Sequence, residues 1–132
     1  MDLKKHDTVA FSDEGATLTL MSPDGSGEPT DIQIVCYGPD SHVVTKLRRE
    51  QSDRRLARAR RPGGGKKVTA AELEAEDCAF LATATKGWSN MQENGKDLPF
   101  SYEEALRVYR EYPWIMEQVN RFIADRANFT KG

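Results

Sequence analysis

Residues 80–129 read FLATATKGWSNMQENGKDLPFSYEEALRVYREYPWIMEQVNRFIADRANF, and this stretch decides the expected fold. The chain has 2 tryptophans, 4 tyrosines and 5 phenylalanines, and most of them, including both tryptophans, lie in this stretch. Aromatic side chains bury the largest apolar area per residue. The best core material of the chain is therefore concentrated in its C-terminal half.

Helix boundaries are also clearest in this part of the chain. Thr69 begins a helix as part of a capping box, and Gly87 is placed to end that helix. Ser101, with Glu104 three residues later, caps a second helix, and Pro113 suits the first turn of a third. We expect the three helices to pack as a small bundle. Their expected ranges are about 70–86, 102–112 and 114–127.

The N-terminal part carries strand signals instead. Residues 8–21 read as one or two short strands and residues 30–37 as a partly covered strand, with a turn rich in Pro and Gly at 22–27. This pattern predicts a β-hairpin or a small antiparallel sheet. Because an isolated hairpin is marginally stable in water, it needs a third strand, a helix or a partner on one face. Residues 9–11 are a candidate for the third strand.

A basic helix is expected after the hairpin. Asp40 or Ser41 can cap it, and it should run over about 42–60. Its apolar positions nearly vanish before Leu56, so we expect its second half to be a solvated extension. The predicted fold class is α+β, with an N-terminal sheet, a basic helix and a C-terminal three-helix bundle. The expected domains are 1–61 with the hairpin and basic helix, 62–68 as a flexible Gly-rich linker, and 69–132 as the helical domain.

Charge is distributed unevenly along the chain. The segment from Lys46 to Lys67 carries a local net charge of +8, whereas the whole chain carries −2. Such an electrostatic arm can attract an anionic partner or dock on an acidic body. The arginines of this arm are Arg48, Arg49, Arg54, Arg55, Arg58, Arg60 and Arg61.

A DNA-binding protein acting through residues 46–67 is the alternative that this arm keeps open. Clustered arginines can neutralise several phosphates and so bind nucleic acid in a salt-dependent way. The arm lacks interleaved aromatic residues for stacking on single strands, and it shows no zinc-finger or homeodomain pattern. Nucleic acid therefore stays the less favoured partner.

The sequence offers little for catalysis or for metal binding. The two histidines, His6 and His42, stand in no Ser–His–Asp or Cys–His arrangement that spacing can support. Cys36 and His42 are too few ligands for a structural zinc site. Residues 63–67 lack the spacing of a phosphate-binding loop. We therefore expect no enzymatic activity, no catalytic residue, no metal and no cofactor.

Targeting signals are also missing from the sequence. No apolar run is long enough for a transmembrane helix, and the N-terminus has no apolar signal region. Cys36 and Cys78 lie far apart in sequence, and two free thiols are the favoured interpretation. We expect a protein of a reducing cytoplasm, with no membrane partner.

The order of several short motifs in the C-terminal half resembles the tail assembly chaperones of long-tailed bacteriophages. The resemblance covers about half of the chain, from Glu72 onward, and the Arg-rich arm is a departure from it. The matching motifs are Phe80-Leu81, Thr85-Lys86-Gly87-Trp88, Asn94-Gly95-Lys96, Leu98-Pro99-Phe100-Ser101, Ala105, Tyr112-Pro113-Trp114-Ile115, Gln118-Val119 and Asp125-Arg126-Ala127-Asn128-Phe129.

This resemblance implies a non-enzymatic assembly factor that acts late in infection. Such a protein binds the long helical tape-measure protein and keeps it soluble until the tail tube polymerises around it. It then leaves, so it belongs to the cytoplasm of the bacterial host and not to the mature virion. The resemblance also implies association with itself and with a frameshift-extended form of itself.

Aromatic residues near the expected helix boundaries are the candidates for binding a partner, because Trp and Tyr are enriched at interface hot spots. For Trp88 packing in the chain's own core is the favoured interpretation, and for Tyr112 and Trp114 both interpretations stay open. The partner-binding candidates are Trp88, Tyr102, Tyr109, Tyr112 and Trp114.

Overall fold

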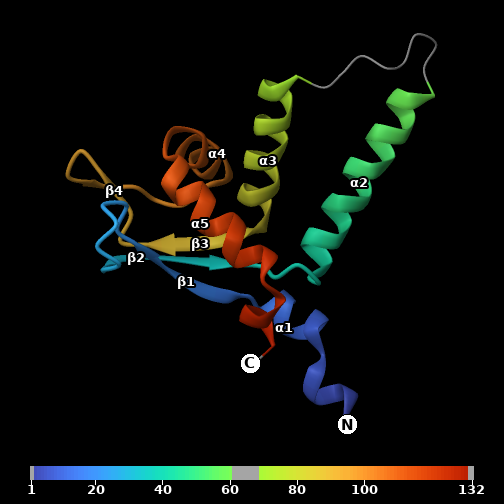
Figure 1. Ribbon diagram of the computed structural model, residues 1–132, viewed down its shortest axis with the longest axis horizontal. Helices are drawn as coiled ribbons and strands as arrows, with labels where there is room; N and C mark the ends of the chain where they lie inside the picture. The colour runs from blue at the N-terminus through green and yellow to red at the C-terminus, as the bar shows by residue number, and fades with distance from the viewer. Residues whose placement is uncertain (1, 61–68, 131–132) are drawn as a thin grey trace.

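A three-stranded antiparallel sheet is the base of the structure, and α-helices lie on one of its faces (Figure 1). The computed structural model describes residues 2–60 and 69–130. The strands of the sheet are β1 (Ala16–Met21), β2 (Pro29–Cys36) and β3 (Thr85–Ser89). The helices are α1 (Thr8–Glu14), α2 (His42–Ala59), α3 (Ala70–Ala84), α4 (Tyr102–Glu111) and α5 (Pro113–Ala124). Short elements complete the fold: 3-10 helices at Leu3–His6 and Arg126–Phe129, and a small ribbon of β4 (Gln92–Glu93) and β5 (Lys96–Asp97).

One face of the sheet is covered by the helices, and the other face is open to solvent. Strand β2 is central, and Ile34 is paired with Leu18 of β1 on one side and with Trp88 of β3 on the other. These apolar side chains share the face that the helices cover, whereas Thr17 and Gln33 on the alternate positions are exposed. This alternation is typical of an antiparallel sheet with one wet face.

The hydrophobic core lies between this sheet and helices α3, α4 and α5. Helix α3 packs on α4 and α5, and α5 also packs on β1. Ile115, Val119 and Ile123 of α5 are buried at the spacing of one helix face. The α+β class and the antiparallel N-terminal hairpin are thus confirmed.

The expected third strand at residues 9–11 is wrong, because these residues lie in α1. The side chain of Asp7 accepts a hydrogen bond from the backbone N–H of Ala10 and so caps this helix. Gly15, at a φ of 86°, ends the helix, and its N–H donates to the carbonyl of Phe11. A local capping interaction therefore overrides the strand propensity of a short apolar run.

The third strand comes instead from the expected end of the helix that begins at Thr69 and from the residues directly after it. Helix α3 ends at Ala84 and not near Gly87, and Thr85–Ser89 pairs with β2. The buried hydroxyl of Thr85 donates to the carbonyl of Leu81 and shares a hydrogen bond with the hydroxyl of Tyr109. Pairing with β2 thus ends the helix before the glycine that the sequence favours as its end.

The last helix is also shorter than expected. It ends at Ala124, and the side chain of Asp125 accepts a hydrogen bond from the N–H of Ala127. This bond caps the 3-10 helix that carries Phe129 into the core. The chain therefore turns where a continuous helix to residue 127 was expected.

The expected helix starts are confirmed. Side chains of Ser41, Thr69 and Ser101 each accept a hydrogen bond from the N–H three residues later, and Pro113 lies in the first turn of α5. The expected linker at 62–68 lies outside the described residues. Chain on both sides of it contributes to one sheet and to one hydrophobic core.

Gly38 marks the point where α1, the β2–α2 connection and the C-terminal segment meet. Its N–H donates to the carbonyl of Ser12. A Cβ at this position would collide with Ser12 Oγ and would lie 2.6 Å from Cγ of Phe129. Nearby, Arg126 binds both carboxylate oxygens of Asp40, at 2.6 and 3.0 Å. These contacts hold the 3-10 helix Arg126–Phe129 against the connection between β2 and α2.

We expect Gly38→Ala to lower the free energy of unfolding by about 1–3 kcal/mol, because the added methyl group overpacks this junction. Urea unfolding followed by circular dichroism measures the change. Gly87→Ala is the matched control, because a Cβ there meets no atom within 4 Å. Equal unfolding midpoints for the two variants would contradict the close approach at Gly38.

Candidate partner-binding surface

Tyr109 is a core residue and presents no surface to a partner. It is 1% exposed. Its hydroxyl lies 2.6 Å from the buried hydroxyl of Thr85 at the start of β3. Burial raises the pKa of this phenol above its usual range. Of the five aromatic candidates, Tyr109 is therefore the one that the structure places deepest in the interior.

Trp88 is held inside the fold by two specific contacts. Its ring packs edge to face on Phe100, with centroids 5.0 Å apart, and its Nε1–H donates to the carbonyl of Leu98 at 2.8 Å. Trp88 is partly buried against the core, and a tryptophan in such a position usually satisfies its N–H in this way. These contacts agree with the interpretation that Trp88 is core material. Tyr102, in contrast, is 44% exposed at the first turn of α4.

Tyr112 and Trp114 are brought together at the sharp turn between α4 and α5. The Tyr112 carbonyl accepts the backbone N–H of Ile115, and Pro113 between the two aromatics begins α5. Both aromatic side chains line a hollow of about 240 Å³. Its other lining residues are Ile32, Met91, Gln92, Glu93, Asn94, Leu98, Val108 and Ile115.

One wall of this hollow is fixed by an ionic network, which we call the Glu93 anchor. Arg107 donates to both carboxylate oxygens of Glu93, at 3.0 and 3.1 Å, and the Tyr112 hydroxyl donates to the same carboxylate at 2.7 Å. Glu104 and Glu111 also accept hydrogen bonds from Arg107. The hydrogen bonds from Arg107 and then from Tyr112 lower the pKa of Glu93. The anchor holds the β4–β5 ribbon against α4.

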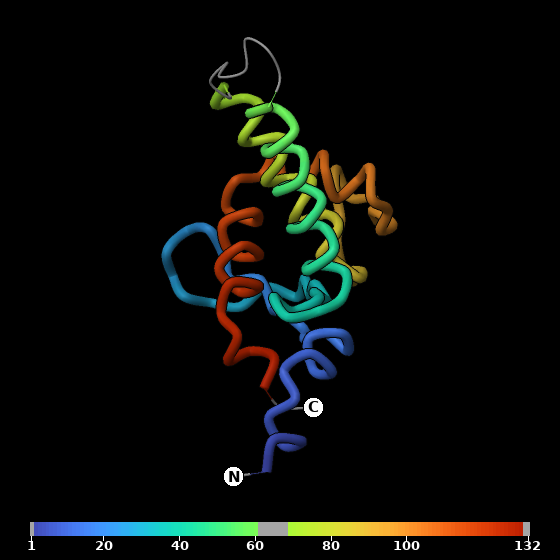
Figure 2. Tube along the Cα trace, turned by 90° about the vertical axis from the view of Figure 1, so that its right-hand side faces the viewer, coloured from blue at the N-terminus to red at the C-terminus, as the bar shows by residue number. Residues whose placement is uncertain are grey.

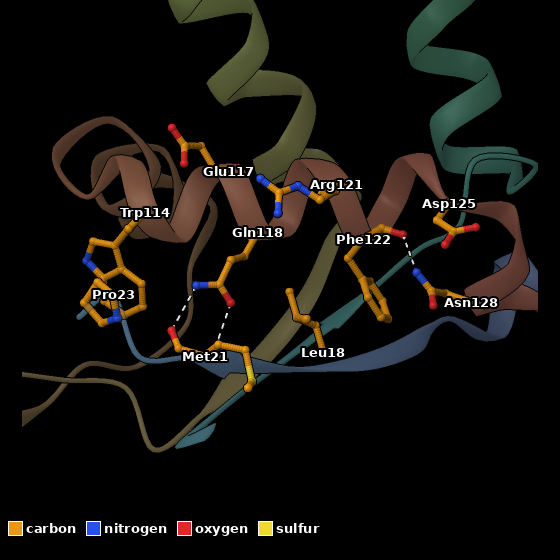
Figure 3. A pocket seen from close by; sticks show the side chains of 10 residues that line it. All are labelled: Leu18, Met21, Pro23, Trp114, Glu117, Gln118, Arg121, Phe122, Asp125 and Asn128. Carbon is orange, nitrogen blue, oxygen red and sulfur yellow. Dashed lines mark hydrogen bonds between the residues drawn. The ribbon is translucent and has the colours of Figure 1, made fainter. Parts of the chain in front are cut away.

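A second, more open groove lies between α5 and the edge strand β1 (Figure 3). Its volume is about 550 Å³. Trp114 and Pro23 stand side by side at one end of the groove, and Leu18 and Phe122 lie together farther along it (Figure 3). The other lining residues are Met21, Glu117, Gln118, Arg121, Asp125 and Asn128.

Gln118 joins the two walls of this groove through the backbone of Met21. The N–H of Met21 donates to Oε1 of Gln118 at 2.8 Å, and Nε2 of Gln118 donates to the Met21 carbonyl at 2.9 Å (Figure 3). The side-chain amide thus pairs with the edge strand as a neighbouring strand would. Edge strands with free backbone groups are prone to unwanted pairing, and this clamp blocks one such position.

Trp114 lines both hollows, and we call it together with its two neighbouring hollows the Trp114 surface. Sequence reasoning named Trp114 and Tyr112 but missed Gln118 and Phe122. Helical spacing could have found them, because residues 114, 118 and 122 follow each other at four-residue steps along one face. Leu18 and Pro23 carry no such signal, since only the tertiary fold brings β1 to α5.

Within the described residues, the electrostatic arm lies on α2, away from the Trp114 surface (Figure 1). Its arginines from Arg48 to Arg60 are exposed, and Arg61 lies outside the described residues. The guanidinium of Arg48 lies 5.6 Å from the ring centroid of Phe80, and Arg55 forms a 3.7 Å ion pair with Glu76. The arm therefore docks partly on α3 of the same chain.

Other kinds of site find little support in residues 2–60 and 69–130. This part of the chain contains no group of three or more metal-ligating side chains placed to hold an ion. Nor does it include a helix with the length and apolar character needed to cross a bilayer. Comparisons with known protein families, with curated proteins and with solved structures found no match.

We expect the Glu93 anchor to hold at neutral pH and to open in acid. A carboxyl group with a lowered pKa in the folded state stabilises that state above its ordinary pKa of about 4.3, and this contribution is lost as the pH falls through the lowered value. Arg107→Met should raise the pKa of Glu93, as measured by carboxyl-carbon NMR titration. Arg110→Met, an exposed change on the same helix, should leave it unchanged. An unaltered Glu93 titration in Arg107→Met would refute the anchor.

Proposed function

We propose that this chain is a non-enzymatic phage tail assembly chaperone that binds the tape-measure protein and keeps it soluble until the tail tube polymerises. The motif order from Glu72 to Phe129 supports the class of protein. The Trp114 surface supports a binding role, because it offers two hollows lined by apolar and polar side chains, with walls held by hydrogen bonds. In this proposal α3, α4 and α5 act as the three-helix bundle that carries the surface.

The observation that carries the proposal is the place of Trp114 between two hollows of about 240 and 550 Å³. Tryptophan in such a position is a typical interface hot spot. Large side chains from one face of a partner helix can enter the hollows on either side of the indole, as in other helix-in-groove complexes. The Glu93 anchor and the Gln118 clamp keep both hollows open without a partner, which reduces the ordering that binding requires.

The proposal extends to the setting of the protein. It acts late in infection in the cytoplasm of the bacterial host and is absent from the mature virion. Its partners are the tape-measure protein, further copies of itself and a frameshift-extended form of itself. It uses no cofactor and no catalytic residue.

We expect Trp114→Ala to abolish rescue of a candidate tape-measure protein co-expressed with this chain, because the shared wall of both hollows is lost. The measurement is the soluble fraction of the tape-measure protein, followed by size-exclusion chromatography with light scattering at low and high salt. Met21→Glu tests the same groove with a charged side chain of similar length in place of an apolar one. Because Met21 is exposed and lines the groove, this change should not disturb the core.

Tyr102→Ala is the matched control, because it removes an exposed aromatic that lines neither hollow. Circular dichroism confirms that each variant is folded. Rescue that survives both Trp114→Ala and Met21→Glu would show that the Trp114 surface is not the binding site. A tape-measure protein that is equally soluble without this chain would remove the proposed function.

DNA binding through residues 46–67 is the second candidate, and the exposure of the arginines on α2 favours it. It requires duplex DNA binding that weakens steeply with salt and is insensitive to Trp114→Ala. The variant that tests it changes Arg54, Arg55, Arg58, Arg60 and Arg61 to Gln. If that variant loses DNA binding while tape-measure rescue is never seen, the arm is the functional part.

A further inference from the structure

Strand β1 is one edge of the sheet, and its backbone groups alternate between the neighbouring strand and the outside. The carbonyl of Leu20 points toward β2, where it accepts the hydroxyl of a threonine. The N–H and carbonyl of Met21 point outward, because both bind the side chain of Gln118 from α5. By the same alternation, Thr17 and Thr19 also direct their N–H and carbonyl groups outward.

A bulge between β1 and β2 does not disturb this alternation. Thr19 pairs with Gln33 and Met21 pairs with Pro29, so the extra residues of the bulge lie in β2 and not in β1. Burial agrees, since Leu20 is fully buried and Met21 is exposed. Strand β1 therefore keeps a regular two-residue period along its length.

Two residues of this edge are open. Among the residues that the structure describes, the outward N–H and carbonyl groups of Thr17 and Thr19 have no hydrogen-bond partner. The usual protections of an edge strand are also missing, because β1 contains no charged residue and no proline. The other edge strand, β3, carries Lys86. Free backbone groups without such protection form a template for one further strand.

The groove beside this edge supplies room for a side chain of an added strand. Helix α5 and the turn after β1 lie on one side of the molecule, and α4 lies on the other (Figure 2). The groove between α5 and β1 has a volume of about 550 Å³, and Leu18 and Phe122 lie together in its part beyond Gln118 (Figure 3). A strand paired with β1 places the residue opposite Leu18 on the same side of the sheet, against Phe122. The neighbours of that residue lie beside Thr17 and Thr19 on the open face.

We propose that the edge of β1 at residues 17–19 binds an extended segment of a partner protein as a fourth strand of the sheet. The segment exchanges backbone hydrogen bonds with Thr17 and Thr19, as the amide of Gln118 already does with Met21. It carries a large apolar residue opposite Leu18 and β-branched or polar residues on both sides of it. The inference goes beyond the proposed function, because it needs neither the indole of the Trp114 surface nor the tape-measure protein.

The free backbone groups favour an extended segment over a helix. A helix satisfies its own N–H and carbonyl groups, so it would leave those of Thr17 and Thr19 unpaired. An extended segment has unpaired backbone groups of its own along both sides. Pairing with β1 satisfies both sets at once.

A second copy of the chain fits this edge less well than a single segment. Because Gln118 reaches the outward groups of Met21, α5 stands over the outer side of β1. Antiparallel pairing of two β1 strands would set them roughly 4.8 Å apart and bring a second α5 over the same strip. Packed helices need about 8–10 Å between their axes, so the two copies would collide. An extended segment without a helix of its own avoids this collision.

The test uses the full chain and a synthetic peptide of about seven residues, roughly 23 Å long when extended. Leu is the central residue of the peptide, Thr flanks it on both sides, and Lys at each end keeps the peptide soluble. NMR of the ¹⁵N-labelled chain measures amide hydrogen exchange. At a free peptide concentration of about ten times Kd, exchange at Thr17 and Thr19 should slow roughly tenfold. Exchange at Leu18, whose backbone faces β2, should not change.

Backbone methylation of the peptide tests the hydrogen bonds directly. N-methyl groups on the residues that flank the central Leu remove the donors to the carbonyls of Thr17 and Thr19. Fluorescence anisotropy should show binding that is weaker by about tenfold or more. A peptide with an N-methyl group on the central Leu is the matched control, because that group points away from β1. Its affinity should stay the same, and this two-residue period distinguishes strand addition from apolar contact alone.

Variants of the chain locate the binding on β1. Thr17→Pro removes an outward N–H, and proline is tolerated at such a position of an edge strand. It should weaken peptide binding about fivefold, because one hydrogen bond is lost. Thr17→Val is the matched control, since valine keeps the N–H and suits a strand. Circular dichroism shows whether both variants are folded, and the methylated peptides test the same bonds in the unaltered chain.

Three results would overturn the inference. One is equal affinity of the peptide methylated at the flanking residues and the peptide methylated at the central Leu. Another is unchanged exchange of the Thr17 and Thr19 amides at saturating peptide. The third is a dimer of the free chain, seen by light scattering, that Thr17→Pro abolishes, because a second copy would then be the occupant of the edge.

Discussion

The pairing of Thr85–Ser89 with the central strand β2 is the constraint on which the rest of the structure depends. A two-stranded hairpin of β1 and β2 would be marginal alone, and β3 makes it a sheet that can support a core. The same pairing ends α3 at Ala84 and buries the Thr85 hydroxyl between Leu81 and Tyr109. One strand therefore joins the N-terminal sheet to the C-terminal helices and fixes where those helices begin to pack.

The position of α5 follows from this junction. Helices α3 and α4 pack on the sheet, and the chain turns at Tyr112 and Pro113 so that α5 packs on β1. There the side chain of Gln118 accepts a hydrogen bond from the backbone N–H of Met21. Residues almost a hundred positions apart thus form one groove beside Trp114. The hydrogen bonds of the Gln118 amide satisfy edge groups that would otherwise be open to solvent, so the groove and the protection of the edge strand have the same physical origin.

The sequence predicted correctly those features that depend on interactions between neighbouring residues. The helix starts at Ser41, Thr69, Ser101 and Pro113 are correct because capping involves only neighbouring residues. Residues 9–11 were assigned to a strand and residues 85–86 to a helix, because a side-chain cap and a long-range strand pairing outweigh weak propensities there. The aromatic candidates were chosen by residue type, which cannot separate Trp114 at the surface from Tyr109 inside. Helical spacing does not make this distinction either, since Tyr102 and Tyr109 fall on the same apolar stripe of α4 and yet are 44% and 1% exposed.

The Trp114 surface and the electrostatic arm differ in the forces that they could offer to a partner. Hydrophobic contacts around Trp114 persist or strengthen with added salt, whereas the exposed charges on α2 are screened within about 8–10 Å at physiological ionic strength. Their rigidity differs as well. The Trp114 surface has walls tied by the Glu93 anchor and by Gln118, while α2 and α3 are joined at their outer level by the weak pair of Arg55 and Glu76. A partner bound at the Trp114 surface would therefore tolerate salt better than one bound by the electrostatic arm.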